Sequence, residues 1–264
     1  MLETELNRLK QEIVQIRCES PDLNRILVEF LSRKSKFIRS YIGFLLLKSF
    51  GIEPSDRHYK ILKVSELIHN SSLIHDDIID NSLFRRGGKS LNSEFGADFA
   101  VISGDFLITT AVEELLELDN NEILKSFLET IKNMCLGETQ QHFMKDKKPT
   151  LDEYLRKTKY KTAYLFSTSI KNLGLPQDAI DYANYYGMAF QIRNDLDNYI
   201  NDGDDHTNGI FTAPYILGGD KKEAIEKTFD LIHNYCIKGE EILIAFPQSI
   251  YREELIKLIE GLSK

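Results

Sequence analysis

The sequence predicts an all-α fold, and three observations support this prediction. Residues that break helices are scarce, with 6 Pro and 15 Gly among 264 residues. No series of short segments with alternating apolar and polar residues, the pattern of repeated β-strands, runs along the chain. A hydrophobic content of 42% is ordinary for a globular protein and allows a sizeable core. Together these features favour packed helices over sheets.

The breaks in the helical pattern divide the chain into about ten helices. The first is expected over residues 1–18, and Ser20-Pro21-Asp22 marks a restart that leads into a helix continuing to about Phe50. Gly51 to Pro54 is an expected turn. The other helices are expected near residues 55–80, 92–117, 121–145, 151–172, 176–201, 212–218, 220–243 and 249–262.

Two further segments are expected to be loops: Arg85 to Gly88, and the polar run from Asp202 to Gly209. No Ser/Pro-rich linker, low-complexity tract or internal repeat interrupts the chain. We therefore expect a single domain over residues 1–264.

Charge and cysteine content narrow the class of protein. The net charge is -8, whereas a nucleic-acid-binding protein is more often basic. Cys18, Cys135 and Cys236 are far apart and show neither a disulfide framework nor zinc spacing, which favours a reducing cytoplasm. The first residues are charged, unlike a signal peptide, and the longest apolar stretch, Tyr41 to Leu47, is too short to span a bilayer. We expect neither nucleic acid nor a stable membrane insertion.

The segment SSLIHDDIIDNSLFRRGG, residues 71–88, has the strongest chemical signal. On a helix, Asp76 and Asp80 are four residues apart and point to one side, and Asp77 stands beside Asp76. Like charges at this spacing destabilise a helix by about 0.2–0.5 kcal/mol, so stability does not call for them. Carboxylates of this kind are ligands that Mg²⁺ prefers, together with waters and phosphate oxygens.

Arg85 and Arg86 follow these acids and are themselves followed by two glycines. Paired guanidiniums in a glycine-flanked loop suit bidentate binding of phosphate. Mutual salt bridges between the acids and the arginines are the alternative explanation.

Basic residues upstream form a second candidate group. Lys36 and Arg39 would lie on one face of the expected helix, where a solvated basic patch is the ordinary explanation. His69 stands seven residues before Asp76 on the same helix face, although a lone histidine is more often structural.

A later helix has a polar stripe formed by Gln191, Asp195 and Asn198 at spacings of four and three residues. Buried polar groups need partners, which a metal ion with its waters or a hydrogen-bond network between helices would supply. Two weaker polar signals are Lys161-Thr162 and the segment GETQQ, which ends at Gln141.

Together these stretches resemble the trans-isoprenyl diphosphate synthases, or polyprenyl synthetase family, from about Lys36 to Pro214. The motif IHDDIIDNSLFRRG is similar to the first aspartate-rich motif of that family with its double arginine. The segments LIHNSSLIHDD, FGADFAVISGDFL, GETQQ, YKTAYLF and FQIRND match further stretches in unbroken order.

The resemblance implies an all-α bundle around a deep central cavity, a homodimer, and condensation of isopentenyl diphosphate with an allylic diphosphate. It implies two or three Mg²⁺ ions, ionisation in a dry pocket, condensation and loss of a proton. The implied roles are these: Asp76 and Asp80 bind metal with support from Asp77; Arg85 binds the allylic diphosphate; Lys36, Arg39, His69 and Arg86 hold isopentenyl diphosphate; Lys161, Thr162 and Gln191 line the allylic cation and the leaving diphosphate; Gln141 is a polar residue near the first metal cluster; and Asn194, Asp195 and Asn198 form a second metal site.

The second motif departs from the family pattern. It is commonly DDxxD but here reads NDLDN, so Asn194 and Asn198 offer uncharged amides and a weaker metal site, while Asp197 is an additional acid. The following loop is shortened, and Ile210 stands where lysine is often found. The first basic motif keeps Lys36 and Arg39 but loses its glycines and proline.

These departures leave two alternatives open: an ionising enzyme, such as a terpene cyclase or a prenyltransferase with a different acceptor, or a partner subunit of a heteromeric synthase. The resemblance also bears on product length, because bulky residues four and five positions before the first aspartate stop growth early. Here those residues are Ser72 and Ser71. We therefore expect a product of geranylgeranyl size or longer.

Overall fold

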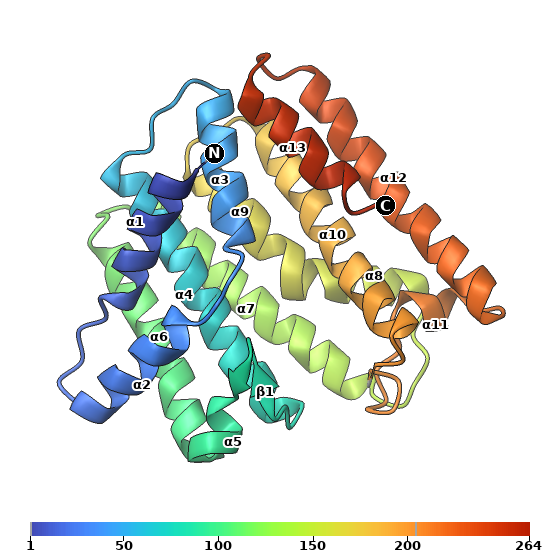
Figure 1. Ribbon diagram of the computed structural model, residues 1–264, viewed down its shortest axis with the longest axis horizontal. Coiled ribbons are helices and arrows are strands. Elements are labelled where there is room, and N and C mark those ends of the chain that lie inside the picture. Colours follow the sequence, from blue (N-terminus) through green and yellow to red (C-terminus); the bar gives the residue numbers. More distant parts are fainter. Residues whose placement is uncertain (1, 204) are drawn as a thin grey trace. The chain divides into compact units, whose positions relative to one another are not determined.

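The computed structural model describes residues 2–203 and 205–264, and it confirms the all-α prediction. The chain divides into two compact units. Figure 1 labels the helices that make them up. Unit 1 comprises Met1–Phe44 and Glu53–Lys125, and unit 2 comprises Leu45–Ile52 and Ser126–Lys264. The prediction of a single domain stays a prediction, so the units are described one at a time.

Unit 1 is built from helices and one short hairpin. Its elements are α1 (Glu3–Val14), α2 (Pro21–Ser32), the first part of α3 (Ile38–Ser49), α4 (Asp56–Ile79), β1 (Phe84–Arg85), β2 (Gly88–Lys89), α5 (Leu91–Phe95), α6 (Ala97–Leu116) and the first residues of α7 (Asn121–Phe143).

Helix α4 is the central element of unit 1. It packs along α6 and also contacts α1 and α5, so apolar residues such as Leu62 and Leu67 are completely buried. A helix that is covered on several sides shows no narrow apolar stripe. Polar residues on its later turns are therefore buried as well, among them Glu66, Asn70 and Asp77. Their burial requires partners, and these partners form the site described below.

Three expectations about unit 1 were wrong. The helix expected near residues 92–117 is two helices, α5 and α6, which are separated at Gly96 with a φ of 89°. The expected helix up to Phe50 is interrupted between α2 and α3, where Phe37 has a φ of 46° and its N–H donates to Ser35 Oγ at 3.4 Å. This local hydrogen bond competes with helical bonding. Lys36 is thus exposed in an irregular segment, and it does not share a helix face with Arg39.

The expected loop at Arg85 to Gly88 is part of a two-stranded hairpin, in which Arg85 pairs with Gly88. Its turn residues Arg86 and Gly87 both have positive φ, 53° and 78°, as type I′ turns require. Strands of two residues are too short to produce an alternating pattern in the sequence.

Unit 2 contains the remaining helices, several of which pack around α10. Its elements are the last part of α3, most of α7, α8 (Leu151–Thr158), the π-helix η1 (Lys159–Ala163), α9 (Tyr164–Asn172), α10 (Gln177–Ile200), α11 (Ala213–Leu217), α12 (Lys221–Ile244) and α13 (Ile250–Glu260). Helix α10 packs against α12, α9, η1, α8 and α11. Its Tyr182 hydroxyl donates to the Leu255 carbonyl of α13 at 2.9 Å.

Two glycines allow α7 and α10 to approach η1 closely. A Cβ added at Gly137 would lie 3.0 Å from the backbone nitrogen of Lys161, and one at Gly187 would lie 2.9 Å from Ala163 Cα. Short π-helical turns within α-helices occur frequently at functional sites. Here the π-turn contains Lys161 and Thr162, two of the predicted site residues.

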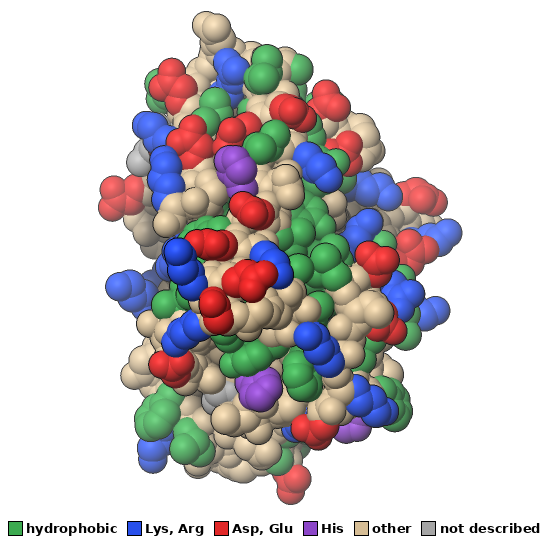
Figure 2. All heavy atoms as spheres, turned by 90° about the vertical axis from the view of Figure 1, so that its right-hand side faces the viewer, with side chains coloured by type: hydrophobic (Ala, Val, Ile, Leu, Met, Phe, Trp, Pro, Cys, Tyr) green, Lys and Arg blue, Asp and Glu red, His purple; other side chains and the backbone are tan. Residues whose placement is uncertain are grey.

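The surface has charged side chains of both signs, as expected for a chain with 33 Lys and Arg and 41 Asp and Glu residues. Figure 2 shows acidic and basic side chains interspersed on one face, with hydrophobic side chains among them. None of the helices in the described ranges is both long enough and apolar enough to cross a membrane.

Gly187→Ala should destabilise the protein by about 1–3 kcal/mol, because the new methyl group meets backbone atoms of η1. Gly239→Ala on α12 is the matched control, since its added Cβ meets mainly the flexible end of Ile259. We expect the control to stay within about 1 kcal/mol of wild type. Urea unfolding measures both, and equal stability of the two variants would contradict the packing argument.

Candidate active site

The first acidic motif lies at the carboxyl-terminal end of α4. Asp76 is half-buried in the last turn, and Asp80 is the exposed residue that ends the helix. The partial negative charge at a helix carboxyl terminus disfavours carboxylates there. Two acids on one side of this end therefore favour a cation nearby.

Asp77 has a different role from its two neighbours. Its side chain is buried with 1% exposure, and Oδ1 accepts hydrogen bonds from Nε of Arg85, at 2.9 Å, and from Nη2. Burial acts to lower the pKa of Arg85, but the hydrogen bonds and charge of Asp77 outweigh it and raise that pKa. Asp77 thus fixes the guanidinium of the hairpin against α4.

A cluster of cations, in which Arg39 is buried and Arg86 is half-buried, lies beside this pair. Arg39 on α3 is 8% exposed, and burial lowers its pKa to about 10, opposed by Glu66 and helped by Arg86. Arg86 Nη1 donates to Asn70 Oδ1 at 2.8 Å, and burial lowers its pKa too. Glu66, 1% exposed, is the acid facing both arginines, and it also accepts from Ser40 Oγ at 2.7 Å.

His69 on α4 belongs to the same cluster. Burial lowers its pKa well below the usual value, and the charges of Arg39, Arg86 and Arg85 lower it further. The imidazole is therefore neutral near pH 7, and it can form hydrogen bonds without adding charge.

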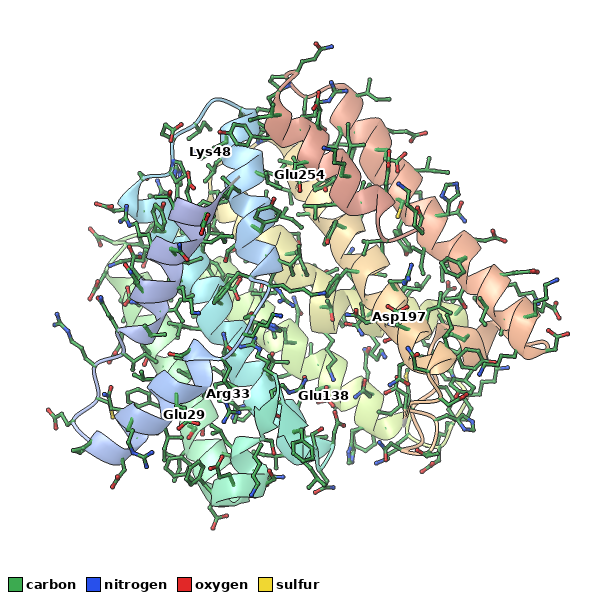
Figure 3. All side chains as sticks on the ribbon, viewed as in Figure 1. Glu29, Arg33, Lys48, Glu138, Asp197 and Glu254 are labelled. Carbon is green, nitrogen blue, oxygen red and sulfur yellow. The ribbon has the colours of Figure 1, made fainter. Side chains whose placement is uncertain are left out.

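Arg33, at the end of α2, is a residue that the sequence analysis missed (Figure 3). Its Nη1 donates to the Lys89 carbonyl of β2 at 2.6 Å, and its guanidinium lies against Gly88, the closest atom 2.9 Å from where a Cβ would stand. The charge of Arg33 helps to lower the pKa of Arg86. Lys36, by contrast, is exposed on the irregular segment between α2 and α3.

In unit 2, four side chains form a hydrogen-bonded network. Thr162 Oγ1 donates to Gln191 Oε1 at 3.1 Å, and Gln191 Nε2 donates to Asp195 Oδ1 at 2.8 Å. Tyr154 donates from its hydroxyl to Asp195 Oδ2 at 2.5 Å. Burial and the charge of Asp195 raise the pKa of Tyr154 well above its usual value, so the phenol keeps its proton. Tyr154 was not identified from the sequence.

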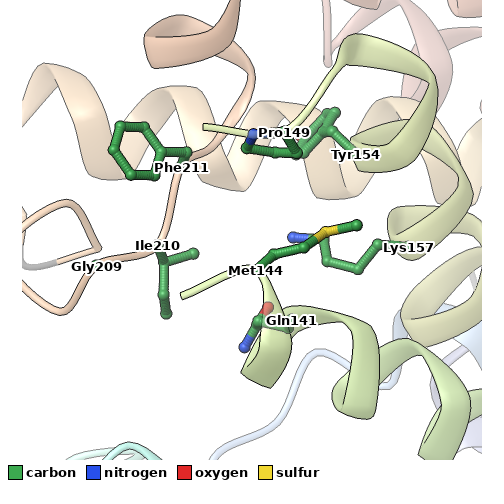
Figure 4. Close-up of a pocket in the computed structure, with 8 residues that line it drawn as sticks. All are labelled: Gln141, Met144, Pro149, Tyr154, Lys157, Gly209, Ile210 and Phe211. Carbon is green, nitrogen blue, oxygen red and sulfur yellow. The ribbon is translucent and has the colours of Figure 1, made fainter. Parts of the chain in front are cut away.

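Two lysines lie next to this network. Lys161 forms an ion pair with Glu138 of α7, which is labelled in Figure 3, and Glu138 also accepts from Gln141 Nε2 at 3.2 Å. Lys157, which the sequence analysis missed, is 8% exposed. It lines a cavity of about 20 Å³ (Figure 4). The lining residues are Gln141, Met144, Pro149, Tyr154, Lys157, Gly209, Ile210 and Phe211.

The side chains of the second motif do not converge. Asn194 is exposed, and Asn198 is half-buried beside Gly203, where an added Cβ would lie 2.7 Å from Asn198 Oδ1. Asp197, labelled in Figure 3, accepts from Arg193 Nε at 2.8 Å, and Arg193 also donates to the Leu262 carbonyl at 3.0 Å. Asp197, the additional acid of the motif, thus orients the arginine that binds the Leu262 carbonyl.

The two motifs differ in how well their residues fit a metal ion. Among the described residues, no three His, Cys, Asp or Glu side chains form a preassembled metal cluster. Mg²⁺ is usually bound by one or two carboxylates together with substrate phosphates. Asp76 and Asp80 can provide the two carboxylates. Next to them, Asp77 Oδ2 is buried and has no hydrogen-bond partner within the described ranges. Asp195, by contrast, uses both oxygens in protein hydrogen bonds.

Comparison with known proteins shows which proteins the chain as a whole is similar to. The family model described as polyprenyl synthetase matches residues 20–241. A prenyl transferase from Synechocystis is 32% identical over 225 residues, which cover 79% of this chain and 66% of the relative. The chloroplastic solanesyl-diphosphate synthase 2 of Oryza sativa is 28% identical, over 81% of this chain and 59% of the relative. The chain thus spans less than two thirds of the length of both relatives.

Solved structures support the fold. The crystal structure of a decaprenyl diphosphate synthase from Rhodobacter capsulatus matches with a TM-score of 0.90. The match covers 99% of this chain and 96% of that one at 22% identity. At this identity the likeness shows the fold alone.

His69 should make the stability of the protein depend on pH. Because its pKa is lowered in the folded state, the unfolded chain binds the proton more readily, and stability falls as pH drops below about 6.5. Between pH 7.5 and 5.5 wild type should lose about 1 kcal/mol more than His69→Gln. Urea unfolding at several pH values measures this difference. His233→Gln, at an exposed position, is the control and should follow wild type; identical pH dependence of all three proteins would contradict the prediction.

Proposed function

Since the chain belongs to the polyprenyl synthetase family, we propose that it condenses isopentenyl diphosphate with an allylic diphosphate to give a longer all-trans polyprenyl diphosphate. The observation that carries this proposal is the arrangement in unit 1, where the half-buried Arg85 lies near the carboxylate pair at the end of α4, and Arg86 and the buried Arg39 lie around Glu66. Such a combination suits a substrate that has a diphosphate and a bound divalent cation.

The cluster of cations is proposed to hold isopentenyl diphosphate. Arg86 lowers the pKa of Arg39, and both arginines lower the pKa of His69, so an anion among these groups would relieve the repulsion between the positive charges. Lys36, exposed before α3, is proposed to reach the same diphosphate from solvent. A lysine on an irregular segment has the freedom to do so.

The end of α4 is proposed to hold the allylic diphosphate. Asp76 and Asp80 would bind Mg²⁺, and Arg85, fixed by Asp77, would contact the diphosphate directly. When bound, Mg²⁺ would neutralise the charge that develops on the departing diphosphate. This chemistry needs no covalent nucleophile.

In unit 2, Lys161, Thr162, Gln191 and Gln141 are proposed to stabilise the ionised allylic group and its leaving diphosphate. The hydrogen bond from Thr162 fixes the Gln191 amide, and the ion pair with Glu138 holds Lys161. Groups that are oriented before the reaction stabilise developing charge without reorganisation.

The product is proposed to be of geranylgeranyl size or longer, in line with the solanesyl and decaprenyl names among the relatives. These names favour chain elongation over transfer to another acceptor or a partner-subunit role. The homodimer and the cytoplasmic location stay predictions, and one relative is chloroplastic.

Purified protein with Mg²⁺, labelled isopentenyl diphosphate and farnesyl diphosphate should give elongated products, whose length chromatography of the extracted lipids reveals. EDTA should abolish them, and Asp76→Ala should lower the rate at least about 100-fold, as expected when a main electrostatic contact is lost. Asp98→Ala, an exposed acid on α6, is the control that should keep full activity. Absence of product with farnesyl and geranylgeranyl starters would refute the proposed function.

The two serines expected to bear on product length, Ser71 and Ser72, differ in their surroundings. Ser71 is completely buried and donates to the Gly104 carbonyl of α6 at 2.8 Å, whereas Ser72 is half-buried and one turn before Asp76. Ser72→Tyr should therefore shorten the product by blocking the path along this helix face. Ser71→Tyr should instead destabilise the fold by about 1–3 kcal/mol. Ser72→Ala is the size control; an unchanged product from Ser72→Tyr would show that this face does not border the growing chain.

A further inference from the structure

Lys157 is a buried lysine for which the proposed reaction gives no role. It stands in the last turn of α8, just before η1, and only 8% of it is exposed. Figure 4 shows its ammonium directed into the small cavity, near Met144 and Ile210. Burial lowers its pKa, and Lys161 lowers it further. Because lysines are almost never buried without a partner, this one calls for a countercharge.

The countercharge is Asp195 of the second motif. Asp195 is 6% exposed, and of all the charged groups near Lys157 it does most to stabilise the ammonium. Tyr154 contacts both groups: its hydroxyl donates to Asp195 Oδ2 at 2.5 Å, and its ring centre lies 5.0 Å from Lys157 Nζ. The lysine, the phenol and the carboxylate thus form one buried unit.

Among the other charged groups around this unit, Asp205 also stabilises the Lys157 ammonium, but less than Asp195 does. Three further acids have partners of their own. Glu138 pairs with Lys161, Asp197 pairs with Arg193 at 2.8 Å, and Asp202 pairs with Lys221 at 2.8 Å. The two remaining residues of the motif, Asn194 and Asn198, are uncharged amides. In the described part of unit 2, Asp195 is therefore the one acid of the motif that faces a buried cation.

A divalent ion at Asp195 would share this buried unit with the ammonium, since Tyr154 contacts both groups. The two positive charges would repel each other in a poorly solvated place, where electrostatic interactions are strong. The ion would also have to displace the hydrogen bonds from Tyr154 and Gln191. The residues of the second motif therefore do not fit a metal site of the kind that the sequence analysis expected.

We propose that the Lys157 ammonium is the resident cation of the second motif, and that it excludes a divalent metal ion from Asp195. The chain then binds metal only through the first motif. This inference rests on the proposed function and extends it. A metal ion would balance the negative charge of the first motif, whereas the Lys157 ammonium balances that of Asp195 in the second.

The test counts bound Mn²⁺ per chain by equilibrium dialysis in the presence of inorganic pyrophosphate. Asp195→Asn should leave the wild-type count unchanged, and Lys157→Arg, which keeps the charge, should also match wild type. Lys157→Met combined with Asn194→Asp and Asn198→Asp should gain about one ion per chain, and adding Asp195→Asn should remove it again. Lys159→Met, an exposed neighbour, combined with the same two aspartates is the control and should gain none.

Loss of an ion from wild type on Asp195→Asn would overturn the inference, since a metal would then already occupy the motif. Equal counts for the Lys157→Met and Lys159→Met combinations would overturn it too. In every variant, loss of ions on Asp76→Asn shows that the protein is folded and that the first motif still binds. Because the count uses pyrophosphate and no prenyl substrate, it is independent of whether the chain elongates a prenyl diphosphate, so the two proposals can fail separately.

Discussion

The burial of carboxylates on α4 is the constraint on which the site in unit 1 depends. Glu66 and Asp77 are each 1% exposed, and an isolated buried charge costs several kcal/mol. Each acid therefore needs cations from elsewhere in the chain. Arg85 is fixed by Asp77, and Arg39 and Arg86 face Glu66. The cluster is thus specified by helix packing, because packing buries the acids.

This constraint also explains the strained hairpin. Arg86 has a φ of 53°, a conformation that costs roughly 1–2 kcal/mol for a residue with a side chain. The turn places adjacent arginines in different contacts, with Arg85 on Asp77 and Arg86 on Asn70. A glycine at position 86 would relax the backbone but would lose the hydrogen bond to Asn70.

The sequence was sufficient for those parts of the fold and site that depend on local spacing. Helix α4 and the shared side of Asp76 and Asp80 follow from helical periodicity alone. Glu66, Tyr154 and Lys157 could not be found in this way, because their importance comes from burial by helices distant in sequence. The break at Phe37 depends on one hydrogen bond from Ser35, and this separated Lys36 from the helix that was expected to contain it.

The two units balance charge in opposite ways, and this difference has a chemical consequence. In unit 1, Arg39 and Arg86 face the single acid Glu66, so this part of the site has positive charge left over for an anion. Neutral His69 adds hydrogen-bonding capacity to that surplus without enlarging it. At the end of α4, by contrast, Asp76 and Asp80 add negative charge near Arg85, which favours a cation there. In unit 2, Lys157 faces Asp195 and Lys161 pairs with Glu138, so the charges are balanced within the protein. An arrangement that is already balanced contributes orientation more than attraction. For the proposed reaction, we therefore expect the attraction for a diphosphate to come chiefly from unit 1, and unit 2 to contribute side chains that are oriented in advance.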